Sequence, residues 1–311
     1  MSMKTYNRLW ALLFGLLVLF SIVGCKTLDE TNVVEGTHLV CDSTGVMVAI
    51  PDRPSRIIPV GVSTEDLVIS LAGPERVLAI GNLPNNFPEA SKQIKHRIKL
   101  NTEAIMALQP DLLIVPDWSD PEMVMMLRAL KIPVYVYKAP HTVPEIKATI
   151  QELASILHEE PKGLAMVADM EQRLTKVETF IAGVSAKKVV AFYGVLGLTG
   201  GMGSTFDTIC QIINVSNAAA MLGLDVSERG TREDLLRINP DVIIVPSNVY
   251  SFDQYKEIDV TNIYTDPALQ TIKAVQNKQV YVIDARWIMS YSQFMVNAVE
   301  TMATDVYGYK Q

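Results

Sequence analysis

Aromatic side chains, one cation and several small polar groups follow the predicted strands of this chain. In parallel α/β sheets, ligands bind beyond the carboxyl ends of the strands, so these residues are candidates for a binding site. Flat rings beside a cation suit a large, partly apolar ligand that carries anionic groups, such as a macrocycle or a catecholate. The predicted ligand-binding residues are Ser63, Asn82, Phe87, Trp118, Tyr193, Gly201, Ser204, Tyr250, Arg286, Trp287 and Tyr291.

Several of these side chains also have a purely structural interpretation. Trp118 and Trp287 can cover the ends of a sheet, and Arg286 can pair with Asp284. For a single aromatic residue, packing and ligand contact are equally compatible with the sequence. The prediction therefore rests on the residues as a group.

A glycine-rich segment from 197 to 205 follows a predicted strand and opens a helix. Backbone N–H groups at such a turn can converge on an anion. The segment lacks both the dinucleotide-binding spacing and the lysine of a phosphate loop. It is interpreted either as cleft lining that touches a carboxylate or phosphate, or as a tight structural turn.

The histidines argue against a bare metal ion as the ligand. The four of them, at positions 38, 96, 141 and 158, show no ligand spacing, so we predict neither a metal site nor a cofactor.

Length and charge limit the function classes. The chain has 311 residues, of which 49% are hydrophobic and 20% charged, enough for two domains with cores of their own. The formal net charge is -7, and no run of Lys and Arg alternates with aromatic residues. Nucleic acid is therefore not an expected partner. Cys41 and Cys210 are far apart in the sequence and are expected to be unbridged.

The N-terminus is typical of a lipoprotein signal peptide. Lys4 and Arg8 precede an apolar stretch from Leu9 to Val23, which is shorter than the roughly 20 residues that a bilayer-spanning helix needs. The stretch ends in Ile-Val-Gly-Cys, which resembles a bacterial lipobox. We predict a signal peptide over 1–24, lipidation of Cys25 and a flexible tether over 25–36. An uncleaved anchor helix is the alternative.

Strands alternate with helices in both halves of the remaining chain, which predicts an α/β fold with parallel sheets. A hairpin over 38–50 opens the first half. A long helical stretch near 164–182 separates the halves and would span about 30 Å. We predict an N-terminal lobe over 37–162, a connecting helix over 163–184 and a C-terminal lobe over 185–311.

An internal repeat relates the two halves. Residues 103–116 (EAIMALQPDLLIVP) align without a gap with residues 233–246 (EDLLRINPDVIIVP). In each copy a short amphipathic helix ends before a proline, an aspartate turns the chain and a buried apolar strand follows. The two lobes are therefore predicted to be built alike and to face each other across a cleft.

The segment 42–58 (DSTGVMVAIPDRPSRII) resembles the opening segment of periplasmic binding proteins for iron siderophores, haem and cobalamin. The resemblance continues through 71–77, both Pro-Asp motifs and 277–281, and covers nearly the whole mature chain. It implies two α/β lobes joined by one rigid helix, with a solute held between them. It also implies a monomer that delivers the solute to an ABC permease driven by a cytoplasmic ATPase, without chemistry on the solute.

In this family, one glutamate on the outer surface of each lobe docks into basic pockets of the permease. The matching positions here are Glu103 and Glu233. Their equivalent places in the repeat fit a two-fold permease, and a carboxylate can pair bidentately with arginine. The alternative is that each glutamate only favours the first turn of its helix, where the helix dipole attracts an anion.

We therefore predict an extracytoplasmic lipoprotein of an ABC importer, held through Cys25 at the outer face of the cytoplasmic membrane or in the periplasm. It would capture an iron complex, either a ferric siderophore or haem, with cobalamin as the alternative solute. Haem would need an axial Tyr, His or Met, and the candidates are Tyr193, Tyr250, Tyr291 and Met202. Cobalamin, whose cobalt is already chelated, would need only aromatic walls. Two other classes stay open: an enzyme on a related two-lobed scaffold, and an adhesin or sensor without a permease. Against an enzyme, the sequence has no nucleophile elbow, no His-Glu-x-x-His motif and no cysteine cluster.

Overall fold

The computed structural model describes residues 35–83, 85–247 and 260–310. The predicted signal peptide, Cys25 and Tyr250 lie outside these residues. In the described part of the chain, no helix is both long and apolar enough to cross a bilayer.

A β-hairpin opens the fold, as predicted. Strands β1 (Thr37–Cys41) and β2 (Met47–Pro51) pair antiparallel around a turn in which Gly45 has a φ of 78°. The Asp42 carboxylate accepts hydrogen bonds from the backbone N–H of Thr44 at 2.9 Å and from the guanidinium of Arg128. The backbone N–H of Ser43 donates to Val136. These bonds fix the turn end of the hairpin to the N-terminal lobe.

The N-terminal lobe is built on a parallel sheet of order β3-β6-β7. A short parallel pair, β4 with β5, continues beside β3. Residues of β6 and β7 are buried along their whole length, because helices cover both faces of the sheet. The elements of this lobe are β3 (Ile57–Pro59), α2 (Val62–Ala72), η2 (Pro74–Arg76), β4 (Ala79–Ile80), α3 (Pro88–Ser91), β5 (His96–Arg97), α4 (Thr102–Leu108), β6 (Leu112–Pro116), α5 (Pro121–Ala129), β7 (Val134–Tyr137) and α6 (Val143–Ile156).

The C-terminal lobe has a second parallel sheet, of order β10-β8-β11-β12, with β9 antiparallel to β8. The predicted return of α/β alternation in the second half is confirmed. The elements of this lobe are β8 (Val189–Gly194), β9 (Gly197–Thr199), α8 (Thr205–Ile212), β10 (Ser216–Asn217), α9 (Ala218–Met221), α10 (Arg232–Ile238), β11 (Val242–Ser247), α11 (Val260–Thr265), η3 (Pro267–Leu269), α12 (Lys273–Gln276), β12 (Val280–Asp284), α13 (Ala285–Ile288) and α14 (Met295–Tyr307).

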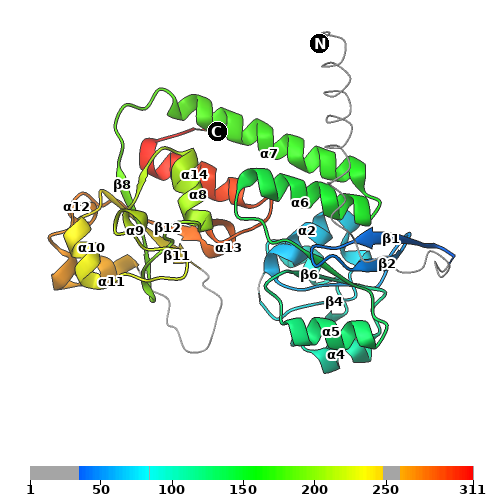
Figure 1. The fold of residues 1–311 in the computed structure, drawn as a ribbon. Coiled ribbons are helices and arrows are strands. Elements are labelled where there is room, and N and C mark those ends of the chain that lie inside the picture. Colours follow the sequence, from blue (N-terminus) through cyan, green and yellow to red (C-terminus); the bar gives the residue numbers. More distant parts are fainter. Residues whose placement is uncertain (1–34, 84, 248–259, 311) are drawn as a thin grey trace, which may run out of the picture.

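One long helix, α7 (Glu160–Ile181), runs across both lobes (Figure 1). It packs against α6 in the first lobe and against α14 in the second, where Arg173 forms a 3.0 Å hydrogen bond with the buried Glu300. The helix begins before the predicted 163–184, since Pro161 occupies its first turn, where no N–H partner is required. Gly163 then allows close contact with α6: a Cβ atom there would lie 2.5 Å from the Cβ of Ala154.

The internal repeat has the same structure in both lobes. Helices α4 and α10 end at left-handed residues, Gln109 with a φ of 47° and Asn239 with a φ of 48°. The following aspartates cap the neighbouring strand in the same way: Asp111 accepts from the N–H of Arg56, and Asp241 from the N–H of Val189, each at 2.9 Å. The repeat is therefore structural as well as sequential.

The largest group of buried apolar side chains continues from the N-terminal lobe through α7 into the C-terminal lobe. This shared core limits how far the lobes can move apart. Cys210 is buried within it and carries a free thiol, so the expectation that Cys210 is unbridged is confirmed. The same expectation for Cys41 is wrong, because Cys41 is disulfide-bonded. Burial raises the pKa of the Cys210 thiol.

Candidate functional site

A cavity of about 300 Å³ lies at the carboxyl ends of β8 and β11, where a ligand is expected in a sheet of this kind. Its volume is at the lower end of the range for small-molecule sites. Phe192 and Phe206 stack at 5.1 Å between ring centroids and form one wall. The lining residues are Phe192, Gly194, Val195, Leu196, Thr199, Gly200, Ser204, Thr205, Phe206, Val226, Ser227, Glu228, Arg229, Pro246, Met289 and Tyr291.

Two of the predicted ligand-binding residues, Ser204 and Tyr291, line this cavity. Ser204 is the N-cap of α8, and its Oγ accepts a 3.0 Å hydrogen bond from the N–H of Asp207. The first turn of that helix therefore faces the cavity with its positive dipole end. Tyr291 comes from the segment that follows α13.

The glycine-rich loop lines the cavity at some residues and forms a tight turn at another. Thr199 and Gly200 line the cavity. Gly201 is structural, because a Cβ atom at this position would lie 2.3 Å from the carbonyl oxygen of Leu224. The adjacent Met202 N–H donates to that same carbonyl at 2.9 Å.

Tyr291 connects this cavity with the N-terminal lobe. Its backbone N–H donates to the Oγ of Ser63 at 3.1 Å, which brings two predicted residues together across the lobes. Its ring lies edge-on to His141, with 6.0 Å between centroids, and burial raises the pKa of its phenol. His141 was not among the predicted residues, because only the folded chain shows that it faces the second lobe.

The N-terminal lobe contributes an exposed aromatic side chain at the carboxyl end of β6. Trp118 is 67% exposed and lies 3.4 Å from the position that a Cβ of Gly61 would take, just before α2. Asn82, which follows β4, is also exposed. Ser63, Asn82 and Trp118 therefore occupy the strand ends predicted for them.

Arg286 and Phe87 contribute to the contact between the lobes. The Arg286 guanidinium forms a 3.0 Å hydrogen bond with the carboxylate of Asp284 and donates at 2.8 Å to the carbonyl of Asn85. The structural alternative for Arg286, pairing with Asp284, is thus realised. Phe87 packs edge-on against Phe294, with centroids 5.2 Å apart.

Two predicted residues point elsewhere. Tyr193 lies between Phe192 and Gly194 on β8, so its side chain points to the face of the sheet opposite to that of Phe192. There it packs in the cluster that contains Leu235. Trp287 faces the groove between α7 and α14 and packs against the main core. Neither lines the cavity.

Two carboxylates that sequence reasoning missed organise the loop before Phe87. Glu65 and Asp66, both on α2, are buried. Glu65 accepts hydrogen bonds from the N–H of Gly81 and the side chain of Asn85, and Asp66 accepts two from Asn86. Burial raises the pKa of Glu65 to about 7 and that of Asp66 to about 6. The Asn85 carbonyl in this loop is the acceptor for Arg286.

Glu103 and Glu233 occupy equivalent outer positions. Each is exposed and is the second residue of its helix, α4 or α10. In the described part of the chain, neither carboxylate takes part in an ion pair. One group of described side chains, His38, Asp52 and His158, could hold a metal ion, and none of the three lines the cavity.

Residues 62–287 match the family model of the periplasmic binding proteins. Among curated relatives, the vitamin B12-binding protein of Pectobacterium carotovorum is 24% identical over 219 residues, 67% of this chain and 78% of that protein. The periplasmic heme-binding protein RhuT of Roseiflexus sp. RS-1 has a similar fold, with a TM-score of 0.72 and 19% identity over 82% of this chain and 98% of that one.

A similar fold is also found in an ABC-type Fe³⁺-hydroxamate transport system protein of Saccharomonospora viridis. The TM-score is 0.67, with 21% identity over 87% of this chain and 99% of that one. At these identities the likeness to solved structures concerns the fold: two α/β lobes joined by a helix.

Proposed function

The chain belongs to the periplasmic binding protein family, and from this premise we propose that it captures an iron complex, a ferric siderophore or haem, for an ABC importer. The observation that carries the proposal is the aromatic-lined cavity at the carboxyl ends of β8 and β11. Tyr291 closes this cavity on the side of the N-terminal lobe, where it contacts Ser63 and His141. The solute would occupy the cavity and extend toward the exposed Trp118.

The lining has the chemistry that such a solute requires. Phe192, Phe206 and Tyr291 offer flat apolar surface, and the exposed Arg229 offers a cation to carboxylate or catecholate oxygens. The first turn of α8, capped by Ser204, adds a weaker attraction for an anion. This combination favours a partly apolar, negatively charged ligand.

If the solute is haem, Tyr291 is the residue we assign to direct contact with its iron. A tyrosine phenolate is one of the axial ligands that haem proteins use. Of the four candidates from the sequence, Tyr193 faces the other side of the sheet, Met202 does not line the cavity and Tyr250 lies outside the described residues. Tyr291 lines the cavity and has an imidazole, that of His141, beside its ring.

Cobalamin is the alternative solute, because a relative at 24% identity is named a vitamin B12-binding protein. Its cobalt arrives chelated, so it would need the aromatic walls but not the Tyr291 phenol. Haem and cobalamin therefore predict different effects of removing that hydroxyl.

The exposed glutamates on the two lobes support a proposal for how the solute is delivered to a permease. We propose that the mature chain is a monomer anchored through lipidated Cys25 outside the cytoplasmic membrane, with Glu103 and Glu233 docking into a permease that a cytoplasmic ATPase drives. The protein would perform no chemistry on its solute. The two carboxylates are exposed at equivalent helix positions, as a two-fold partner would require.

The test is native mass spectrometry with absorption spectroscopy on the full-length chain in detergent, after incubation with ferric siderophores, haem or cobalamin. A one-to-one complex with an iron compound supports the proposal, and Tyr291→Phe should weaken haem binding at least about tenfold. Tyr193→Phe is the matched control and should leave affinity unchanged. A complex with cobalamin alone, insensitive to Tyr291→Phe, would favour the alternative, and no complex with any compound would contradict both.

A further inference from the structure

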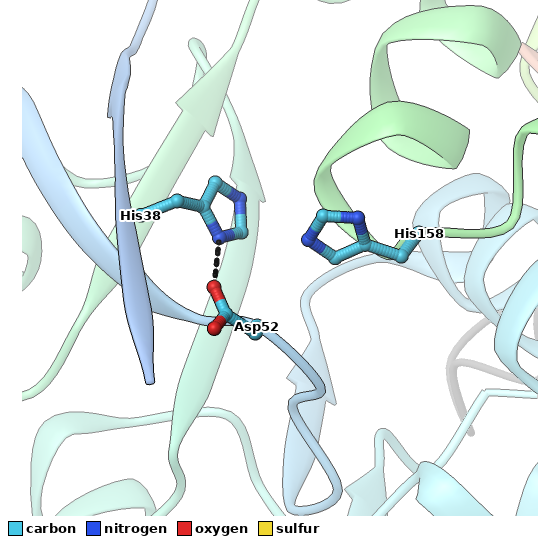
Figure 2. Close-up of side chains that lie close together, drawn as sticks. All are labelled: His38, Asp52 and His158. Carbon is cyan, nitrogen blue, oxygen red and sulfur yellow. Dashed lines mark hydrogen bonds and ion pairs between the residues drawn. The ribbon is translucent and has the colours of Figure 1, made fainter. Parts of the chain in front are cut away.

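Three side chains capable of binding a metal meet at the edge of the N-terminal lobe, away from the cavity. His38 comes from β1, Asp52 follows β2 directly, and His158 lies between α6 and α7 (Figure 2). The His38 Nδ1 atom is 3.3 Å from the Asp52 Oδ1 atom. The rings of His38 and His158 are 4.9 Å apart between centroids, and one ligand atom from each of the three residues lies within 4.8 Å of the others.

The fold creates this arrangement from distant parts of the sequence. His38 is opposite Ile50 in the hairpin, so Asp52 is its diagonal neighbour on the same face. The backbone N–H of Asp52 donates to the carbonyl of Gly36 at 2.9 Å, which fixes the end of β2. His158 has a φ of 55°, the left-handed conformation that ends α6 and turns the chain into α7.

We propose that His38, Asp52 and His158 bind a zinc ion, with water completing the coordination. Two imidazoles and one carboxylate are a ligand set that Zn²⁺ accepts. Zn–N and Zn–O bonds of about 2.0–2.2 Å place tetrahedral ligand atoms roughly 3.3 Å apart, the separation that His38 and Asp52 already have. The ligand atom of His158 lies within 4.8 Å of the other two, and its side chain is exposed, so it is free to rotate toward them.

The surroundings favour a cation. A hollow of about 430 Å³ beside the cluster is lined by His38 and His158 and also by Glu152 and Glu160. Glu152 accepts a 2.6 Å hydrogen bond from the Tyr135 hydroxyl, whereas Glu160 is exposed in the first turn of α7. These carboxylates raise the local concentration of cations without acting as ligands themselves.

Zinc bound here would fasten the open end of the hairpin to the junction of α6 and α7. The turn end of the hairpin is already held by Asp42, which bonds to Arg128 and to the N–H of Val136. At the open end, the ring contact between His38 and His158 links the hairpin to that junction. Because zinc would bind the folded chain, it should also raise the thermal midpoint.

The proposal is tested on the full-length chain, purified without a polyhistidine tag. Zinc content after dialysis and a competition titration with a chromogenic chelator give stoichiometry and affinity. We expect one zinc per chain, and a loss of at least tenfold in affinity for His38→Ala, His158→Ala and Asp52→Asn. His96→Ala, which changes a histidine outside the cluster, is the matched control and should stay within twofold of wild type.

A second measurement needs no variant. Zinc should protect His38 and His158 of the wild-type chain from carbethoxylation, while His96 reacts as before. Copper(II) at the same site should give an electron paramagnetic resonance spectrum with coupling to imidazole nitrogen. The proposal is overturned if zinc does not bind, if the double variant His38→Ala, His158→Ala binds it as well as wild type, or if zinc protects neither histidine.

Discussion

The backbone N–H of Tyr291 in the C-terminal lobe donates a 3.1 Å hydrogen bond to the Oγ of Ser63 at the start of α2 in the N-terminal lobe. Near it, Arg286 donates to the carbonyl of Asn85, and the side-chain amide of Gln293 donates to the Oγ of Ser70 at 2.7 Å. A hydrogen bond contributes about 0.5–1.5 kcal/mol net, so contacts of this kind can hold the lobes together and still open for a solute.

Replacing Arg286 with alanine should loosen the lobe contact. The variant loses the bond to Asn85 and the pairing with Asp284, at a cost of about 1–3 kcal/mol for a charged group. Hydrogen exchange of the backbone over 82–87 should become faster. Arg237→Ala removes an exposed pair with Asp234 inside one lobe and should have little effect. Unchanged exchange over 82–87 in the Arg286 variant would count against this role.

The contribution of two buried carboxylates to stability should fall as the pH rises from about 4 toward 7. The pKa of Glu65 is raised from 4.5 to about 7, so between these values the folded chain binds more protons than the unfolded chain. The contribution of Glu65 to the free energy of unfolding is therefore most favourable below pH 4.5 and is lost as the pH rises to 7. Asp66 adds a similar dependence between 3.8 and about 6.

Urea unfolding at several pH values measures this dependence. Each group contributes a slope of at most about 1.4 kcal/mol per pH unit within its window. Glu65→Gln should flatten the curve between pH 5 and 7, whereas Glu89→Gln, which changes an exposed carboxylate, should not. A residual slope is expected from Asp66 and from Asp305, whose pKa is raised by burial to about 6. Equal curves for wild type and Glu65→Gln would refute the assignment.

Reversing the charge at both outer glutamates should abolish transport. The double variant Glu103→Lys, Glu233→Lys should retain wild-type affinity for the solute, since neither residue lines the cavity. Uptake in cells and binding by the purified protein measure the two properties separately. Glu122→Lys is the matched control, because Glu122 is also exposed and second in its helix, α5. Replacing Glu122 removes only the favourable interaction of its carboxylate with the helix dipole, which stabilises the helix by about 0.3–1 kcal/mol. Uptake should therefore persist in this variant.

Alanine at Gly201 should destabilise the C-terminal lobe more than alanine at Gly203. At Gly201 the new Cβ would lie within 2.5 Å of the carbonyl oxygens of Leu224 and Asp225, so the backbone must shift. Overpacking of this kind typically costs about 1–3 kcal/mol. Gly203 has open space and a φ of 78°, so only conformational strain opposes the change. Chemical unfolding of the two variants compares them, and equal midpoints would contradict the steric argument.

Local and periodic features of the fold were readable in the sequence. Helix α4 (Thr102–Leu108) and strand β7 (Val134–Tyr137) are examples. Both have strong local determinants: Asn101 caps α4 through the N–H of Ala104, and an unbroken apolar run forms β7. The sequence repeat, with its Pro-Asp motifs, correctly predicted that the helix, turn and strand of each copy have the same structure in both lobes.

The orientation of individual side chains was decided by the tertiary structure. Tyr193 and Phe192 are neighbours on β8, and nothing in their local sequence shows which face of the sheet meets the cavity. Trp287 lies beside the groove between α7 and α14, which pack against each other, and it does not line the cavity. Alternation along a strand specifies two faces, but only the neighbouring helices decide what each face meets.

Long-range proximity was likewise beyond the sequence. His38 and His158 are 120 positions apart (38 to 158), so no ligand spacing could relate them. Glu65 and Asp66 bind the loop that follows β4. The sequence predicted ligand-binding residues in this loop, but it did not indicate that the loop covers two buried carboxylates. The sequence by itself determined the elements, the repeat and the family, because these depend on local propensity and apolar periodicity. The tertiary structure decided which polar groups share a site, because that depends on how helices and sheets from distant segments pack.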